Sequence, residues 1–120
     1  MAALIGRWRN LVSLGVPIHI VGNGEQRRDF THVDDIVDGL VRIMETAIFT
    51  SILIFELGTR RNYSINEVYN MFKERFPYIT KEYLPEQEGN YRETLRYNDN
   101  ALIYLDWYPE DRLNDYIQGL

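Results

Sequence analysis

The sequence predicts a small α/β domain of four to five helices and a few short strands. Three observations support this fold class. Apolar residues recur with helical spacing in several segments, short apolar runs of strand length lie between them, and capping or turn residues separate the two kinds of segment. With 120 residues the chain is expected to form one domain, residues 1–120. Its strands are too few and too short to predict a large doubly wound sheet.

The first helix is expected over residues 4–12, where apolar residues share one helical face. Gly15 and Pro17 are expected to end it. The apolar run 18–21 predicts a short strand, and residues 22–24 (Gly-Asn-Gly) predict the turn that closes it.

Residues 28–31 predict a second extended segment, followed by a helix. Thr31 with Asp34 three positions later resembles a capping box for this helix. The helix has the clearest amphipathic pattern in the chain, and its apolar face is expected to point inward. That face comprises Val33, Ile36, Val37, Leu40, Val41 and Met44.

The continuous apolar run 52–55 predicts a buried strand that ends near Gly58. Ser64 and Glu67 form a second capping-box pattern, which predicts a helix reaching Phe76. Its inward residues are expected to be Ile65, Val68, Tyr69, Phe72 and Phe76.

The last third of the chain predicts short elements around a polar loop. The expected elements are a strand at 81–84, a loop at 85–90, an extended segment at 94–97, a helix capped by Asn98 or Asp99 and running to Leu105, and a last helix capped by Asp111 and ending near Ile117.

Composition excludes several classes of function. The net charge of −5 argues against non-specific nucleic-acid binding, which requires a basic surface. The sequence has no cysteine, so disulfides and thiolate chemistry are excluded. No apolar run reaches the length of a membrane span, and the N-terminal residues do not match a secretory signal. We therefore expect no nucleic-acid or membrane partner and a cytoplasmic location.

The adjacent pair Arg27 and Arg28 follows a Gly-rich turn, a position from which a guanidinium can reach phosphate oxygens. Taken alone, such a pair is more often solvated or paired with nearby acidic residues. The Gly22–Gly24 pattern favours a turn over a phosphate-binding loop, because no complete Gly-rich nucleotide motif occurs in the sequence.

Other catalytic patterns are weak. The chain has only two histidines, His19 and His32, and no third residue at a spacing suited to a metal, so no metal site is expected. Tyr69 and Lys73 match the Tyr-x-x-x-Lys spacing of many NAD enzymes. Because Tyr69 lies on the apolar face of its helix, core packing is the favoured interpretation.

Three blocks together resemble the C-terminal, substrate-binding lobe of the extended short-chain dehydrogenase/reductase superfamily, the NAD-dependent nucleotide-sugar epimerases and dehydratases. The blocks are residues 22–35 (GNGEQRRDFTHVDD), residues 55–59 (FELGT) with 63–68 (YSINEV), and residues 89–109, which end in LDWYP. They occur in the order found in that family and span most of the chain.

The resemblance implies that Arg28 contacts the diphosphate of a nucleotide sugar and that His19 and Val21 flank the base. The family usually has an arginine and an acidic residue, which meets the ribose, at the positions of Gln87 and Asn90. Because these two residues are uncharged here, binding is expected to be weaker. Loss of one cationic phosphate contact costs about 1.5–3 kcal/mol, or roughly one to two decades of affinity.

No counterpart of the family's dinucleotide-binding half or of its catalytic segment occurs in the 120 residues. We therefore expect no NAD or other cofactor to be bound by this chain alone, and no catalytic residues. The leading interpretation is a truncated or stand-alone nucleotide-sugar-binding lobe without catalysis of its own. The alternatives are a subunit completed by a separate NAD-binding (Rossmann-domain) chain and a degenerate scaffold that forms a homodimer.

Overall fold

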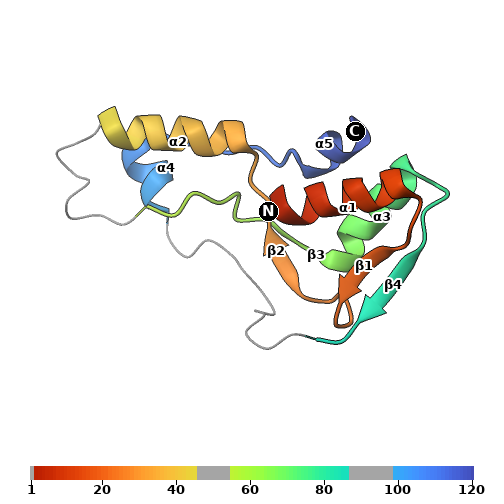
Figure 1. Ribbon diagram of the computed structural model, residues 1–120. Coiled ribbons are helices and arrows are strands. Elements are labelled where there is room, and N and C mark those ends of the chain that lie inside the picture. The colour runs from red at the N-terminus through yellow and green to blue at the C-terminus, as the bar shows by residue number, and fades with distance from the viewer. Residues whose placement is uncertain (1, 46–54, 87–98) are drawn as a thin grey trace.

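The computed structural model describes residues 2–45, 55–86 and 99–120, and it confirms the small mixed α/β fold. Figure 1 shows the arrangement of the elements, which follow one another along the chain without a long regular sheet. They are α1 (Ala2–Leu14), β1 (Ile18–Val21), β2 (Arg27–Asp29), α2 (Val33–Glu45), β3 (Asn62–Ser64), α3 (Ile65–Arg75), β4 (Lys81–Leu84), α4 (Asn100–Leu105) and α5 (Leu113–Gln118).

The described strands form two separate two-stranded sheets. β1 pairs with β4 in parallel, with Ile18 opposite Lys81 and Val21 opposite Leu84. β2 pairs with β3 antiparallel, with Arg28 opposite Tyr63. The sequence did not predict β3, because three residues directly before a helix are too few to show strand periodicity. This second sheet places the Arg27–Arg28 pair beside the start of α3.

The main hydrophobic core lies between α1, α3, α5 and β1. Trp8 and Phe72 are buried at its centre, and their rings meet edge to face with centroids 5.4 Å apart. The Trp8 indole donates a hydrogen bond of 3.1 Å to the His19 carbonyl, which fixes α1 against β1. Four of the five inward residues predicted for α3 are confirmed as buried, namely Ile65, Val68, Tyr69 and Phe72; Phe76, the C-cap residue, is partly buried against the same core.

The predicted inward face of α2 is wrong. Five of its six apolar residues are exposed in the structure, with exposed fractions between 44% and 78%: Val33, Val37, Leu40, Val41 and Met44. The buried residues of the helix are Asp35 and Gly39 instead. Helical periodicity identifies an apolar face but not the body that covers it. Here the opposite side of α2 packs on the described chain.

Two contacts explain why α2 turns this side inward. Gly39 lies so close to Leu57 and the Trp107 indole that an added Cβ would lie 2.9 Å from Leu57 and 3.1 Å from Trp107. The Asp35 carboxylate accepts hydrogen bonds from the Arg112 guanidinium and from the backbone N–H of Glu110. The smaller second core of Ala101, Leu105 and Trp107 lies beside α2.

The helix caps only partly follow the sequence. Ser64 and Glu67 form the predicted capping box of α3, with both reciprocal hydrogen bonds present. The Thr31 box is wrong: the Thr31 hydroxyl donates to Asp29, while His32 Nδ1 accepts the N–H of Asp34 at 3.0 Å. Thr31 is thus bound to Asp29 of β2, and His32, one residue later, supplies the side chain that accepts a hydrogen bond from the first turn of α2.

The C-terminal helices differ in a similar way. Asp99 is the N-cap residue of α4 but makes no side-chain cap, because its carboxylate pairs with Arg60 at 2.9 Å. The predicted Asp111 cap of α5 is wrong, since Arg112 is the N-cap residue and Asp111 accepts from the Tyr63 hydroxyl. The predicted extended segment at 94–97 lies outside the described residues. So does most of the predicted strand at 52–55, of which only Phe55 is described, without strand structure.

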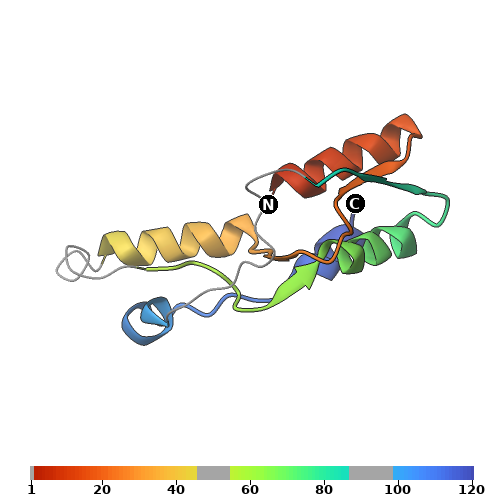
Figure 2. The same ribbon diagram turned by 90° about the horizontal axis from the view of Figure 1, so that it is seen from below.

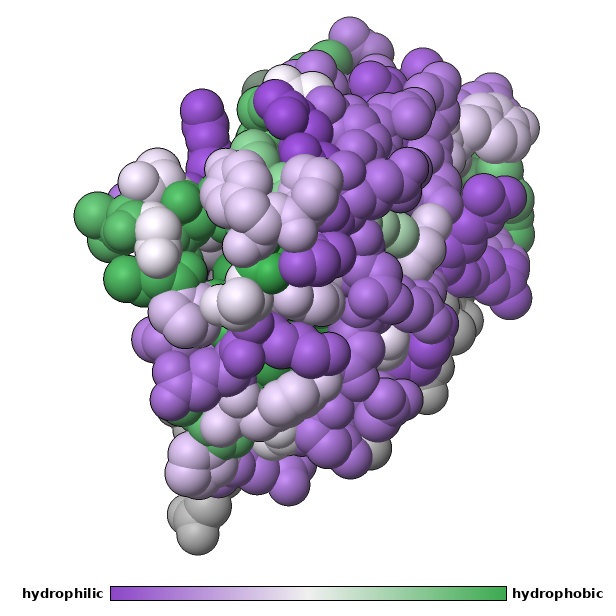
Figure 3. Space-filling view, turned by 90° about the vertical axis from the view of Figure 1, so that its right-hand side faces the viewer, coloured by the Kyte–Doolittle hydropathy of each residue, from purple (hydrophilic) through white to green (hydrophobic). Residues whose placement is uncertain are grey.

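The molecule is extended for its size. Its radius of gyration is 16.5 Å, whereas a compact 120-residue domain would have about 14 Å. In both ribbon views α2 and α4 form an arm beside the body of α1, α3 and α5 (Figures 1 and 2). Figure 3 shows a mostly hydrophilic face at the other end of the molecule, with hydrophobic residues gathered at its edge. Among the described helices, none is long and apolar enough to cross a membrane.

Candidate functional site

The turn after β1 is held in place by the first turn of α3. Gly24 has a φ of +77°, which favours glycine, and an added Cβ would lie 2.1 Å from Oδ1 of Asn66. The Asn66 amide donates to the Asn23 carbonyl at 3.0 Å and to the Glu25 carboxylate at 2.7 Å. The Asn66 backbone N–H also donates to the Gly24 carbonyl. The turn therefore has one defined position relative to β2.

Arg27 and Arg28 have different roles although they are adjacent. The Arg27 guanidinium donates to the side chain and the carbonyl of Asn62 and to the Glu67 carboxylate, at 2.9, 3.0 and 3.2 Å. Its donors are used to hold β2 against β3 and α3. The Arg28 guanidinium makes one hydrogen bond, to the Arg27 carbonyl at 2.8 Å, and no ion pair with a described residue. Arg28 is half-buried and keeps donors for an anion.

Asp29 organises the segment that leads into β3. Its carboxylate accepts hydrogen bonds from the Thr59 N–H, the Thr59 hydroxyl and the Arg60 N–H, at 2.8–3.1 Å. Arg60 has a φ of 65°, in the left-handed region, so this turn relies on the carboxylate for support. Asp29 therefore has a structural role, because its hydrogen bonds fix β2, the strand that carries Arg28.

The other predicted site residues are placed only in part. His19 is exposed on β1, and its Nε2 lies 3.9 Å from the Glu82 carboxylate of β4. Val21, two residues further along β1, is half-buried, and its carbonyl accepts a hydrogen bond from the Gln26 side-chain amide. Both lie at the parallel β1–β4 pair. Gln87 and Asn90 lie outside the described residues.

The Tyr69–Lys73 pair is structural. Tyr69 is buried, and its hydroxyl donates to the Ile79 carbonyl at 3.4 Å. The Lys73 ammonium donates to the same carbonyl at 2.7 Å. The two side chains therefore hold the segment between α3 and β4.

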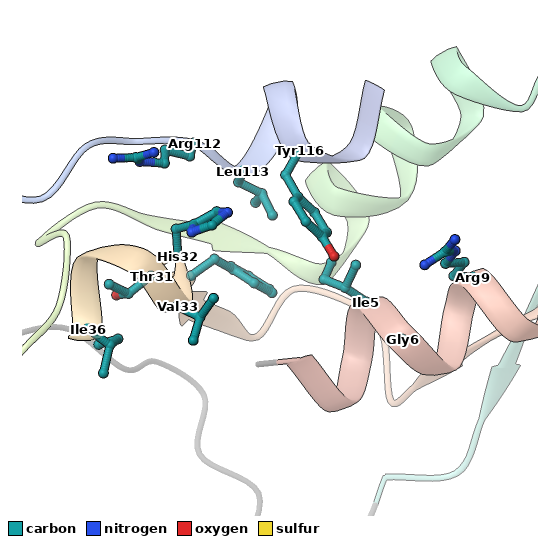
Figure 4. Close-up of a pocket in the computed structure, with 11 residues that line it drawn as sticks. Ile5, Gly6, Arg9, Thr31, His32, Val33, Ile36, Arg112, Leu113 and Tyr116 are labelled. Carbon is teal, nitrogen blue, oxygen red and sulfur yellow. The ribbon is translucent and has the colours of Figure 1, made fainter. Parts of the chain in front are cut away.

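A cavity of about 450 Å³ opens where α1, α5 and the start of α2 meet. It is lined by Ile5, Gly6, Arg9, Phe30, Thr31, His32, Val33, Ile36, Arg112, Leu113 and Tyr116. Figure 4 shows Leu113 and Tyr116 of α5 facing Ile5 of α1, while the Arg112 guanidinium points away from them. Arg28 is not among them, so the cavity and the predicted diphosphate contact are separate.

Sequence reasoning missed the buried group that joins the arm to the body. Asp35 is 7% exposed, its carboxylate is paired with Arg112, and its carbonyl accepts from the Trp107 indole at 2.7 Å. The partners lie more than 70 positions away along the chain, and no local pattern signals such a pairing. Asn66 was missed because its side chain holds a turn more than 40 positions earlier in the chain.

Comparison with known proteins identifies the family to which this chain belongs. Residues 1–55 match the sequence model of the NAD dependent epimerase/dehydratase family. The chain is 32% identical over 96 residues to a UDP-glucuronate 4-epimerase of Thermodesulfobacterium geofontis, covering 78% of this chain and 29% of that protein. It is 29% identical over 100 residues to UDP-glucuronic acid decarboxylase 1 of Arabidopsis thaliana, covering 82% and 22%.

Solved structures agree. A Bacillus cereus UDP-glucuronic acid 4-epimerase in complex with UDP-glucuronic acid and NAD matches 96% of this chain with a TM-score of 0.88 and 26% identity, over 37% of its own length. A UDP-glucose 4-epimerase of Thermotoga maritima with UDP-glucose matches 95% of this chain and 36% of its own, with a TM-score of 0.82 and 26% identity. The chain belongs to the NAD-dependent epimerase/dehydratase family of extended short-chain dehydrogenases, and it spans between 22% and 37% of the length of these relatives.

Proposed function

We propose that residues 1–120 form one substrate-binding-type domain that binds a nucleotide sugar, with Arg28 contacting the diphosphate. The observation that carries the proposal is the contrast within the arginine pair. All three guanidinium nitrogens of Arg27 donate to Asn62 or Glu67, whereas only one nitrogen of Arg28 donates to a described residue, on a strand fixed by Asp29. A guanidinium with open donors on a rigid strand suits bidentate contact with phosphate oxygens.

The relatives support the ligand class. The Bacillus cereus epimerase was solved with UDP-glucuronic acid and the Thermotoga maritima epimerase with UDP-glucose. His19 and Val21, at the β1–β4 pair, are the proposed neighbours of the base. Glu82 faces His19, and Glu86 lies 3.7 Å from a Cβ built on Gly22. Two carboxylates near this edge disfavour a second anionic group there, so we place the diphosphate at Arg28 alone.

We propose further that the chain by itself does not transfer hydride. Epimerases of this family work through NAD, and hydride transfer requires the cofactor to be held against the sugar. The 120 residues contain no Gly-rich dinucleotide motif, and their one Tyr-x-x-x-Lys match is used in packing around Ile79. On this proposal the NAD-binding portion must come from outside these residues.

The test is a ligand-observed NMR titration of the chain with UDP-glucuronic acid, UDP-glucose and a thymidine diphosphate sugar. We expect saturable binding at millimolar ligand, reduced about tenfold or more in Arg28→Ala because a hydrogen bond to a charged group contributes about 1.5–3 kcal/mol. Arg7→Ala, on exposed α1 surface, is the control with the same change in net charge. Equal binding by both variants, or none by the wild type, rejects the proposal.

A second candidate is a subunit that a separate NAD-binding chain completes. The exposed apolar face of α2 and the extended shape favour it, because a large exposed apolar patch commonly marks a protein interface. Co-purification from the source with a chain that binds NAD, and epimerase activity only in the mixture, are expected. The degenerate homodimer makes the opposite prediction: a dimer in light scattering and no NAD-binding partner.

A further inference from the structure

The cavity between α1, α5 and the start of α2 has an unusual lining for this acidic protein. The chain carries 18 acidic residues, yet no Asp or Glu lines the cavity, whereas Arg9 and Arg112 do. Its walls are otherwise mainly apolar or aromatic, with Phe30 and Leu113 buried beneath them. The lining is thus hydrophobic and free of acidic side chains in a molecule of net charge −5, and Arg9 is its one cation not paired with a described carboxylate.

Two of the polar side chains at the cavity have no partner among the described residues. Arg9 makes no hydrogen bond or ion pair with any residue in the described ranges, and neither does the Tyr116 hydroxyl. Arg112 is different, since its guanidinium is held by Asp35 and Glu110. Figure 4 shows the Tyr116 hydroxyl directed toward α1, on which Arg9 lies.

His32 is a separate donor at the cavity, and the Asp34 carboxylate lies 3.7 Å from its Nδ1. Its Nδ1 accepts the N–H of Asp34 at 3.0 Å, so in the neutral ring the proton lies on Nε2. Nε2 has no hydrogen-bond partner among the described residues. The ring packs edge-on against Tyr116, with centroids 5.8 Å apart, and Figure 4 shows it on the side of Tyr116 away from Arg9.

We propose that this cavity binds a small organic anion with an aromatic or aliphatic body, its acidic group at Arg9 and the Tyr116 hydroxyl. A carboxylate accepts several hydrogen bonds, and a guanidinium and a hydroxyl without partners among the described residues suit it. The apolar walls suit a ring or chain rather than a sugar, whose hydroxyls would lose water without gaining partners. The volume of about 450 Å³ is in the usual range for such ligands.

The site is distinct from the proposed nucleotide-sugar contact, because Arg28 does not line the cavity. The two can therefore be tested separately. The probe is 1-naphthoate, an aromatic carboxylate, and its neutral analogue 1-naphthalenemethanol is the control for the charge. Binding is followed by methyl and amide chemical shifts of the full chain. We expect saturable shifts centred on Ile5, Val33 and Leu113, and about fivefold or weaker binding of the neutral analogue.

Two variants at the cavity test the donors and the walls. Arg9→Gln should weaken naphthoate about fivefold, while Arg7→Gln, on the same helix but outside the lining, should leave it unchanged. Val33→Asp adds a carboxylate at a side chain that is 64% exposed, so it should fold normally and abolish binding. No saturable shift, equal binding of the neutral analogue, equal effects of the two arginine variants, or shifts centred elsewhere on α2 would each overturn the proposal.

Discussion

Replacement of Gly24 by alanine tests how the turn beside Arg28 is held. The backbone φ of +77° costs an L-residue about 1–2 kcal/mol. The new Cβ would also lie 2.1 Å from Oδ1 of Asn66, so the amide must rotate away. Rotation breaks its bonds to Asn23 and Glu25 and the bond it accepts from Tyr83, which are exposed and together contribute about 1–2 kcal/mol. We expect Gly24→Ala to lower the free energy of unfolding by about 2–4 kcal/mol.

A double-mutant cycle separates the two causes. In an Asn66→Ala background the clash is absent, so Gly24→Ala should cost only the backbone share of about 1–2 kcal/mol. Urea unfolding followed by tryptophan fluorescence measures the four free energies. A cost of Gly24→Ala that is the same in both backgrounds would refute the view that Asn66 locks this turn, and would leave backbone strain as the sole cause.

Three further changes test other parts of the structure. Asp35→Asn should destabilise the fold by about 1–2 kcal/mol in urea, because the half-buried Arg112 loses its paired charge; a loss below about 0.3 kcal/mol would show that the pair adds nothing. Burial and the hydrogen bond to Asp111 raise the pKa of Tyr63 to about 12. The folded state therefore keeps this proton above pH 10, and stability should fall as pH rises from 10 to 12, less steeply in Tyr63→Phe. Leu40→Asp should change stability by less than about 0.5 kcal/mol, because the side chain is 49% exposed; a loss of several kcal/mol would mean that the face is covered in solution.

Local signals in the sequence predicted the local structure well. The Ser64–Glu67 pattern gave the capping box of α3, and the Gly15 turn ended α1 where expected, at a φ of 71°. Such features depend on interactions between residues within four positions of one another, so a short stretch of sequence contains all the groups that form them. The buried face of α3 was predicted from the helical spacing of its apolar residues, and the prediction held because the core lies on that one side of the helix.

Contacts between distant segments could not be predicted in this way. The sequence predicted Thr31 and Asp111 as helix caps. In the structure the Thr31 hydroxyl donates a hydrogen bond to Asp29 instead, and the Asp111 carboxylate accepts one from the Tyr63 hydroxyl. A short polar side chain has several partners of similar energy, and tertiary placement decides among them. The candidate site shows the same limit. The sequence indicated an arginine pair, but only the bonds of Arg27 to Asn62 and Glu67 show which arginine is left with open donors.

The α2 helix shows what an amphipathic pattern does and does not specify. Its five exposed apolar residues, at 33, 37, 40, 41 and 44, form a stripe about a quarter of the way around the helix, and the half-buried Ile36 lies at the edge of this stripe. The described chain instead packs on the opposite side, through Gly39 and Asp35, with contacts too specific to be incidental. The separate NAD-binding chain proposed above would supply a body for the exposed stripe, and we expect it to pack there. The Leu40→Asp variant then has a second use, because it should weaken that association while leaving the isolated chain folded.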